Sequence, residues 1–273
     1  GRHDFVEPPL REELYNKWHA GCAAGILNAP DPSFDPEKDK DLYRQYNAKD
    51  HPEGKKENKR YLQREFGLIQ DDKAPIFFWP SRLDRRQKGC QLLSEILYRV
   101  VAKYWEENIQ FLFVANGEFQ NHFRDIVNFH GIHQQVAICD FNEWLEHLAY
   151  GAADFVLMPS LFEPCGLPQM IGAIYGALPI VHDTGGLHDT VVPLDVKNNS
   201  GNGFIFETYD SGGLFWAIQE AMKFYKLPAK FKAEQIERVM TESAAVFNHD
   251  VTAQQYIELY EKMLQRPLIT SPF

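Results

Sequence analysis

The chain is 273 residues long, 44% of them hydrophobic, and carries a formal net charge of −10 at pH 7. This length allows one large domain or two small ones, and the hydrophobic content is ordinary for a globular protein. The acidic balance argues against a nucleic-acid partner, whose phosphates demand a basic face. Because no run of eighteen apolar residues occurs, no membrane span is expected. The four scattered cysteines show no paired metal spacing, which predicts a reducing compartment such as the cytoplasm.

Residues 1–74 show no pattern of an independent hydrophobic core. A short helix is predicted at Leu10–Trp18 and another at Asn58–Phe66, where Gly67 provides the stop. Between the two lies an acidic, proline-rich loop with aspartates at positions 31, 35, 39 and 41. These aspartates lack the spacing and the central glycine of a calcium-binding loop, so we expect a solvated loop.

From Pro75 onward, short apolar strands alternate with amphipathic helices. The predicted strands are Ile76–Trp79, Ile109–Val114, Val136–Ile138, Asp154–Met158, Leu178–Val181 and Gly203–Phe206. The predicted helices are Gln91–Trp105, Phe119–Phe129, Asn142–Gly151, Leu167–Tyr175, Leu187–Val191, Ser211–Tyr225, Lys232–Ala244 and Asp250–Leu264. Such alternation predicts an α/β fold of the Rossmann-like kind, with a parallel sheet covered by helices on both faces.

The stretch from Met158 to Thr190 contains two glycine-bearing loops, each following a predicted strand. The first reads Glu163-Pro-Cys-Gly-Leu and leads into a helix at Pro168, and the second reads Thr184-Gly-Gly-Leu. Parallel strands release their loops at one edge of the sheet, so the two loops are expected to lie together. Free amides at helix starts suit anions, and phosphate is the usual occupant.

A basic loop, Pro80–Gly89, follows the first predicted strand and contains Arg82 and Lys88. Two cations at the carboxyl end of a sheet can neutralise a diphosphate. A solvated basic loop without a ligand is the alternative. The sequence has no Asp-x-Asp pair in a strand-end loop and no paired histidines at metal spacing in this region, so we predict no metal.

Five motifs together resemble the bacterial glycogen synthase and plant starch synthase family of retaining GT-B glycosyltransferases. They are Gly25-Ile-Leu-Asn, Asn58-Lys-Arg-Tyr-Leu-Gln, Gln87-Lys-Gly, Glu163-Pro-Cys-Gly-Leu and Thr184-Gly-Gly-Leu-x-Asp-Thr-Val. The resemblance implies that residues 75–273 are the C-terminal lobe, which binds the nucleotide-glucose donor. Residues 1–74 are then an interlobe linker and N-terminal extension. The lobe that binds the α-glucan acceptor is expected to precede residue 1, and the location is cytoplasmic, or plastidic in a plant.

The same resemblance implies the residues of the donor site. Arg82 and Lys88 contact the diphosphate, and Glu163 holds ribose or sugar hydroxyls. Phe141 stacks on the nucleobase. The other implied donor-binding positions are Gly117, Cys165, Gly166, Leu167, Thr184, Gly185 and Gly186. The donor is ADP-glucose or UDP-glucose.

Three departures from the family pattern keep other functions open. Leu161 replaces a common arginine, Pro168 a frequent threonine, and His182-Asp183 a pair that often contains arginine. Each removes positive charge or a hydrogen-bond donor from the phosphate side. The sequence therefore allows three functions: an α-glucosyltransferase, another GT-B sugar-nucleotide enzyme such as a sucrose synthase-like transferase or an epimerase, and a catalytically silent nucleotide-binding lobe.

Overall fold

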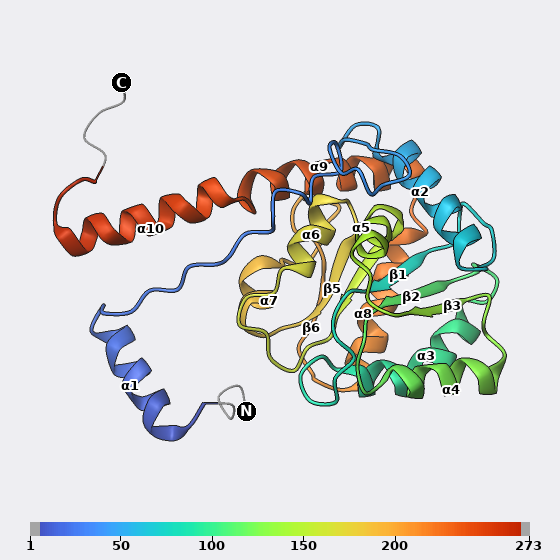
Figure 1. The fold of residues 1–273 in the computed structure, drawn as a ribbon, viewed down its shortest axis with the longest axis horizontal. Helices are drawn as coiled ribbons and strands as arrows, with labels where there is room; N and C mark the ends of the chain where they lie inside the picture. Colours follow the sequence, from blue (N-terminus) through green and yellow to red (C-terminus); the bar gives the residue numbers. More distant parts are fainter. Residues whose placement is uncertain (1–5, 269–273) are drawn as a thin grey trace.

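A computed structural model describes residues 6–268 of the chain, and its centre is one parallel β-sheet (Figure 1). The strands are β1 (Ile76–Trp79), β2 (Gln110–Val114), β3 (Val136–Cys139), β4 (Phe155–Met158), β5 (Leu178–His182) and β6 (Phe204–Phe206). They are ordered β3-β2-β1-β4-β5-β6, and every neighbouring pair is parallel. The predicted Rossmann-like α/β fold is confirmed.

The strand order reverses direction between β1 and β4. In a sheet of this kind, the connections on the two sides of the reversal wind in opposite directions, so a crevice opens beyond the carboxyl ends of the two central strands. The loops that follow β1 and β4 therefore flank the place where such folds bind ligands.

Helices cover both faces of the sheet. Their bounds are α1 (Pro8–His19), α2 (His51–Glu65), α3 (Cys90–Lys103), α4 (Gln120–His130), α5 (Glu143–Ala152), α6 (Pro168–Ile174), α7 (Gly185–Thr190), α8 (Ser211–Tyr225), α9 (Ala229–Val246) and α10 (His249–Leu264). Helices α3, α4 and α8 pack on one face, and α2, α5 and α6 lie on the other.

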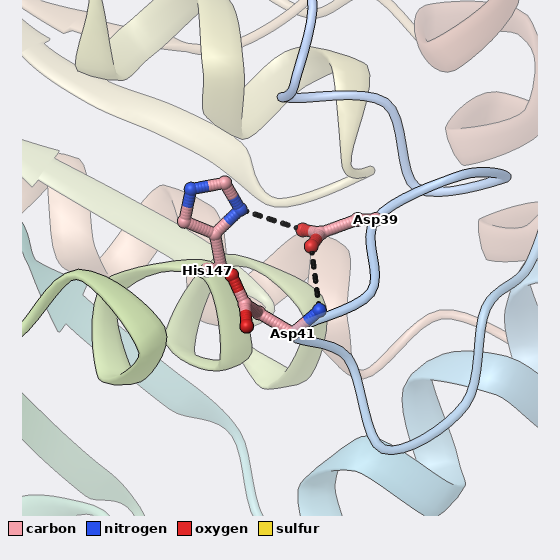
Figure 2. Close-up of side chains that lie close together, drawn as sticks. All are labelled: Asp39, Asp41 and His147. Atoms are coloured by element: carbon pink, nitrogen blue, oxygen red, sulfur yellow. Dashed lines mark hydrogen bonds and ion pairs between the residues drawn. The ribbon is translucent and has the colours of Figure 1, made fainter.

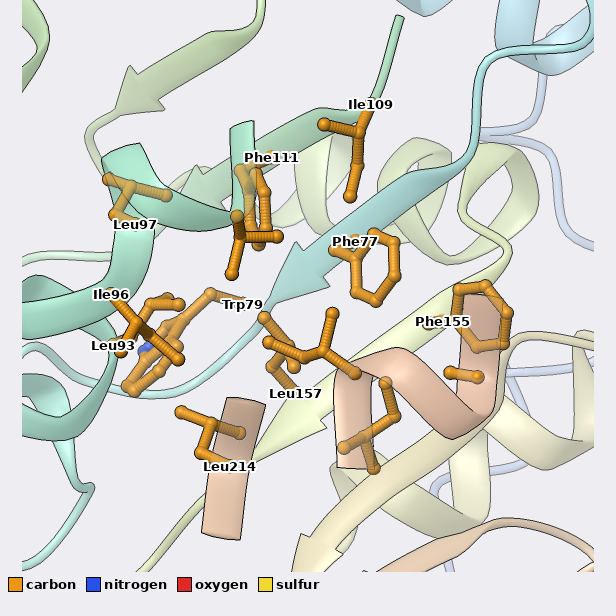
Figure 3. Close-up of a cluster of buried hydrophobic side chains, with 14 of the residues drawn as sticks. Phe77, Trp79, Leu93, Ile96, Leu97, Ile109, Phe111, Phe155, Leu157 and Leu214 are labelled. Carbon is orange, nitrogen blue, oxygen red and sulfur yellow. The ribbon is translucent and has the colours of Figure 1, made fainter. Parts of the chain in front are cut away.

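Alternation along the strands divides the core into two clusters, one on each face. In β1, Phe77 and Trp79 point toward α3 and α8, where Leu93 and Leu214 meet them (Figure 3). The intervening Phe78 points to the opposite cluster. Burial of each such side chain stabilises the fold by roughly 1.5–3 kcal/mol.

The segment before β1 packs against the helices that cover one face of the sheet, which the sequence did not predict. Helix α2 begins at His51, seven residues before the predicted start at Asn58, with Pro52 in its first turn. Its early buried positions include His51 and Lys55, polar residues that a hydrophobic pattern assigns to solvent. The expectation of a solvated aspartate loop is wrong for Asp39, which is only 4% exposed.

Helices α1 and α10 extend away from the body formed around the sheet (Figure 1). Neither contains a buried residue in the described chain. The extended segment after α1 runs beside α10, and the hydroxyl of Thr252 donates a hydrogen bond to the carbonyl of Leu27. Among residues 6–268, no helix is long and apolar enough to cross a membrane.

Candidate donor-binding site

The loops after β1 and β4 are tied together across the point where the strand order reverses. The amide of Leu161 donates to the carbonyl of Gln87 at 2.8 Å, and the Gln87 side-chain amide donates to the carbonyl of Phe162 at 3.3 Å. Gly89 has a φ of +74°, and a Cβ there would lie 2.0 Å from the carbonyl oxygen of Pro159. Only glycine allows this close approach of the two loops.

Asp84 organises the basic loop from within. Its Oδ1 accepts hydrogen bonds from the backbone N–H groups of Arg86, Gln87 and Lys88, at 3.0, 2.7 and 3.4 Å. Burial opposes ionisation of this carboxyl, but the three backbone hydrogen bonds outweigh it and lower the pKa of Asp84. The loop is thus held in one conformation that directs Lys88 toward the loop after β4.

Lys88 and Glu163 meet in the crevice. Lys88 Nζ lies 2.5 Å from Glu163 Oε2, and the two side chains are 12% and 10% exposed. The hydroxyl of Ser160 also donates to Glu163 Oε2, at 3.3 Å. Arg82, from the same loop as Lys88, has an exposed side chain. The structure therefore places a cation and a carboxylate in contact at the switch point, with a second cation on the loop that carries the first.

The second glycine loop packs directly on the backbone of the first. The amide of Gly186 donates to the carbonyl of Glu163 at 2.8 Å. A Cβ on Gly185 would lie 2.2 Å from the carbonyl oxygen of Glu163, and a Cβ on Gly186 would lie 2.0 Å from that of Cys165. Within residues 6–268, the amides of Cys165, Gly166 and Leu167 donate no hydrogen bond, so these N–H groups remain free for a ligand.

Two buried polar residues that the sequence did not single out join these loops. Gln169 Nε2 donates to the carbonyls of Cys165 and Gly166, at 3.1 and 2.9 Å, and to Thr190 Oγ1 at 3.0 Å. Thr190 in turn donates to the carbonyl of Gly186 at 2.6 Å. Gln169 stands among apolar residues in the first turn of α6. A lone amide side chain in an apolar helix was the signal available to find it.

The loops after β2 and β3 complete the same edge of the sheet. A Cβ on Gly117 would lie 2.3 Å from the carbonyl oxygen of Leu83, so the β2 loop touches the basic loop through its glycine. Asn116 accepts a hydrogen bond from the backbone N–H of Phe141 at 3.0 Å. Phe141 is 52% exposed, so its ring is available for a planar group to stack on.

A separate polar cluster consists of Asp39, Asp41 and His147 (Figure 2). Asp39 Oδ2 accepts from His147 Nδ1 at 2.8 Å and from the hydroxyl of Tyr175 at 2.5 Å, and its Oδ1 accepts from the amide of Asp41 at 2.9 Å. Both carboxylate oxygens of Asp39 thus have protein donors. The spacing of the three side chains alone would suit a cation, but these hydrogen bonds instead hold the aspartate loop against α5 and the end of α6. We call this hydrogen-bonded cluster the latch.

Comparison with known proteins identifies the family of this fold and site. Residues 63–238 match the family described as glycosyl transferases group 1. The chain belongs to the glycosyl transferases group 1 family. It is 36% identical over 245 residues to the glycogen synthase of Bacillus cereus (strain B4264), a match that covers 89% of this chain and 49% of that protein. It is 35% identical over 266 residues to the glycogen synthase of Lachnoclostridium phytofermentans, covering 96% and 54%.

Solved structures agree with this assignment. The catalytic domain of Starch Synthase IV from Arabidopsis thaliana, bound to ADP and acarbose, superposes with a TM-score of 0.84 at 34% identity, covering 97% of this chain and 53% of that one. Sucrose-phosphate synthase from Thermosynechococcus elongatus gives a TM-score of 0.63 at 21% identity, which shows the shared fold alone. The predicted resemblance to the glycogen and starch synthases is confirmed. The chain spans about half the length of the curated relatives it matches.

Within this glycosyltransferase framework, Pro168 and His182 have structural roles. Pro168 begins α6, as predicted, where its missing N–H costs no helical hydrogen bond. His182 is buried, and its Nδ1 lies 2.8 Å from the carbonyl oxygen of Ser160, which links the end of β5 to the loop after β4. Leu161 is half-buried, but its link to the basic loop uses only the backbone N–H, so the structure does not explain the leucine side chain.

Proposed function

We propose that this chain is the donor-binding lobe of a retaining α-1,4-glucosyltransferase of the glycogen and starch synthase type. The observation that carries the proposal is the Lys88–Glu163 contact at the switch point of the sheet, in a chain 34–36% identical to glycogen and starch synthases. A nucleotide-glucose donor has a diphosphate that needs cations and a sugar whose hydroxyls need an acceptor. One contact supplies both groups.

The roles follow from charge. As the glycosidic bond to the diphosphate breaks, negative charge grows on the leaving group, and preorganised cations and amides stabilise it. Lys88 and Arg82 supply the cations, and the free N–H groups of Cys165, Gly166 and Leu167 supply the dipoles. Glu163 accepts hydrogen bonds from ribose or glucose hydroxyls.

The remaining donor-binding positions surround these groups. Phe141 offers its exposed ring to the nucleobase, and Gly117 leaves room beside the basic loop. Thr184, Gly185 and Gly186 form the wall behind Glu163 and Cys165. The acceptor, an α-glucan, lies on a second lobe that residues 6–268 do not include. Residues 1–74 link that lobe to residues 75–273.

A second candidate function is a nucleotide-binding lobe without transferase activity. The observation in its favour is the mutual neutralisation of Lys88 and Glu163, together with Leu161 in place of a common arginine. With Lys88 paired, Arg82 is the remaining one of the two cations assigned to the diphosphate. Both candidates require nucleotide binding, so binding is the first property to measure.

Isothermal titration calorimetry of the chain with ADP, UDP, ADP-glucose and UDP-glucose tests the proposal. We expect one nucleotide to bind and its affinity to fall at least about tenfold in Lys88→Ala and in Arg82→Ala, since each loses a charge-assisted contact. Arg85→Ala is the matched control, because Arg85 lies in the same loop but pairs with Glu118 on the surface. No binding by any nucleotide, or equal affinity in all three variants, would contradict the donor-site assignment.

A further inference from the structure

A cavity of about 250 Å³ opens at the opposite edge of the sheet from the donor site. It lies where β4 begins, between α2, the end of α8 and the beginning of α9. Four lysines line it: Lys55, Lys56, Lys59 and Lys232. Apolar side chains, among them Phe224 and Ile236, also line it. Nothing in the proposed glucosyl transfer uses this cavity.

Two of the four lysines are neutralised by aspartates within the cavity. Lys59 Nζ lies 2.7 Å from Asp154 Oδ2, and Lys56 Nζ lies 3.3 Å from Asp72 Oδ2. Asp154 Oδ2 also accepts a hydrogen bond from the backbone N–H of Ile76 at 2.8 Å. The two carboxylates of the cavity are therefore committed to two of the cations.

The other two lysines have no carboxylate partner among the described residues. Lys55 is 7% exposed, and its Nζ donates to the carbonyls of Tyr150, Gly151 and Tyr175, at 3.4, 3.4 and 2.9 Å. Lys232 Nζ lies 4.1 Å from the centre of the Tyr225 ring. Carbonyl dipoles and a ring face satisfy these cations less well than an anion would, and an ammonium without an anion is costly to bury.

The titration of the same groups agrees with this geometry. Burial lowers the pKa of Lys55 to about 7, with Asp154 opposing the shift and Lys59 adding to it. Burial also lowers the pKa of Lys232. In both lysines burial and the repulsion of Lys59 outweigh the attraction of Asp154.

We propose that this cavity binds the phosphate group of a small phosphomonoester. The four lysines of the cavity exceed its two aspartates by two positive charges, which matches the two negative charges of a phosphomonoester dianion, and lysine is an established point-charge binder of phosphate. The apolar side chains of Phe224 and Ile236 receive the organic part. The volume is below that of ordinary drug-sized sites, which restricts the ligand to a molecule smaller than a nucleotide sugar. Occupation would fix α9 against α2.

Calorimetry with phenyl phosphate tests the proposal on the whole chain. We expect phenyl phosphate to bind, inorganic phosphate to bind more weakly because it lacks the apolar part, and phenol not to bind. Lys232→Gln should weaken phenyl phosphate binding at least about tenfold. Lys230→Gln is the matched control, since Lys230 lies on the same helix and is exposed outside the cavity. Its affinity should equal that of the parent.

A third variant separates this cavity from the donor site. Lys88→Ala should leave phenyl phosphate binding unchanged, because Lys88 lies at the other edge of the sheet. Lys55→Met provides a second probe of the cavity, with circular dichroism to confirm that it folds. The proposal is overturned if the parent does not bind phenyl phosphate, if Lys232→Gln binds like the parent, if inorganic phosphate binds as tightly as phenyl phosphate, or if Lys88→Ala abolishes binding.

Discussion

Lys88 and Glu163 form a buried ion pair across the switch point of the sheet, with Nζ and Oε2 2.5 Å apart. The lysine comes from the loop after β1, and the glutamate comes from the loop after β4. In the proposed complex these groups serve different parts of the donor, the diphosphate and the hydroxyls. In the free chain they form an ion pair with each other, so the pair holds the two loops together in the absence of a donor.

A double-mutant cycle should show strong coupling between the two residues. Removing one partner leaves the other charge buried and uncompensated, so Lys88→Met and Glu163→Gln should each lower the free energy of unfolding. The double variant should lose less than the sum of the two single losses, because it leaves no unpaired charge. We expect a coupling of roughly 0.5–3 kcal/mol from urea unfolding. The exposed pair Arg85–Glu118 is the control and should couple much less. Additive effects at Lys88 and Glu163 would mean that the contact does not stabilise the free chain.

Glu163→Ala should affect one class of ligand more than another. If the carboxylate holds hydroxyls, its loss should reduce affinity for ADP-glucose or UDP-glucose more than affinity for pyrophosphate, while the fold is retained. Calorimetry with a sugar nucleotide and with pyrophosphate measures both. Equal losses for the two ligands would assign Glu163 a structural role in the loop.

The packing of the two glycine loops predicts a severe effect for Gly186→Ala. The added Cβ would meet the Cys165 carbonyl oxygen at 2.0 Å, so the loop with the free amides must move. We expect a loss of roughly 1–3 kcal/mol in unfolding free energy and weaker nucleotide binding. Gly25→Ala is the control, because a Cβ there meets nothing within 4 Å. Parent-like stability and affinity in Gly186→Ala would contradict the described loop contact.

The sequence predicted the sheet well because each strand is a short apolar run followed by a loop of distinct composition. The same logic placed Lys88 and Glu163 in loops at the carboxyl end of the sheet, but it did not predict their direct contact. It did not predict the roles of Gln169, Lys55 or Asp39. These polar residues are buried because partners distant in sequence satisfy them, such as the carbonyl of Tyr175 for Lys55. No local pattern encodes such partners.

The latch at Asp39 and His147 predicts a dependence of stability on pH. Burial opposes both charges, but their mutual hydrogen bond prevails, so the pKa of His147 is raised above 6.5 and that of Asp39 is lowered below 3.8. The His147 contribution is complete below pH 6.5 and is lost as the pH rises through the higher folded pKa. The Asp39 contribution is present above pH 3.8 and is lost as the pH falls through the lower folded pKa.

The difference in unfolding free energy between the parent and Asp39→Asn should therefore be largest between pH 3.8 and 6.5. Taking this difference removes the contributions of ionisable groups that both proteins share. One of them is Glu146, because burial raises its pKa to about 7. Urea unfolding at several pH values measures it. A difference that does not change with pH would mean that the latch is a neutral hydrogen bond.

The proposed division of labour predicts that this chain binds nucleotide without elongating a glucan. Residues 6–268 contain one Rossmann-like sheet, and the curated glycogen synthases are about twice as long as the matched part. Holding donor and acceptor in one geometry can supply about 7–11 kcal/mol of a barrier. A donor lobe alone provides half of that geometry. We therefore expect no primer-dependent release of ADP or UDP when the chain is incubated with ADP-glucose or UDP-glucose and glycogen. The Bacillus cereus glycogen synthase is the positive control. Robust primer-dependent release by the chain would show that its own residues also bind the acceptor, and the proposed restriction to donor binding would be wrong.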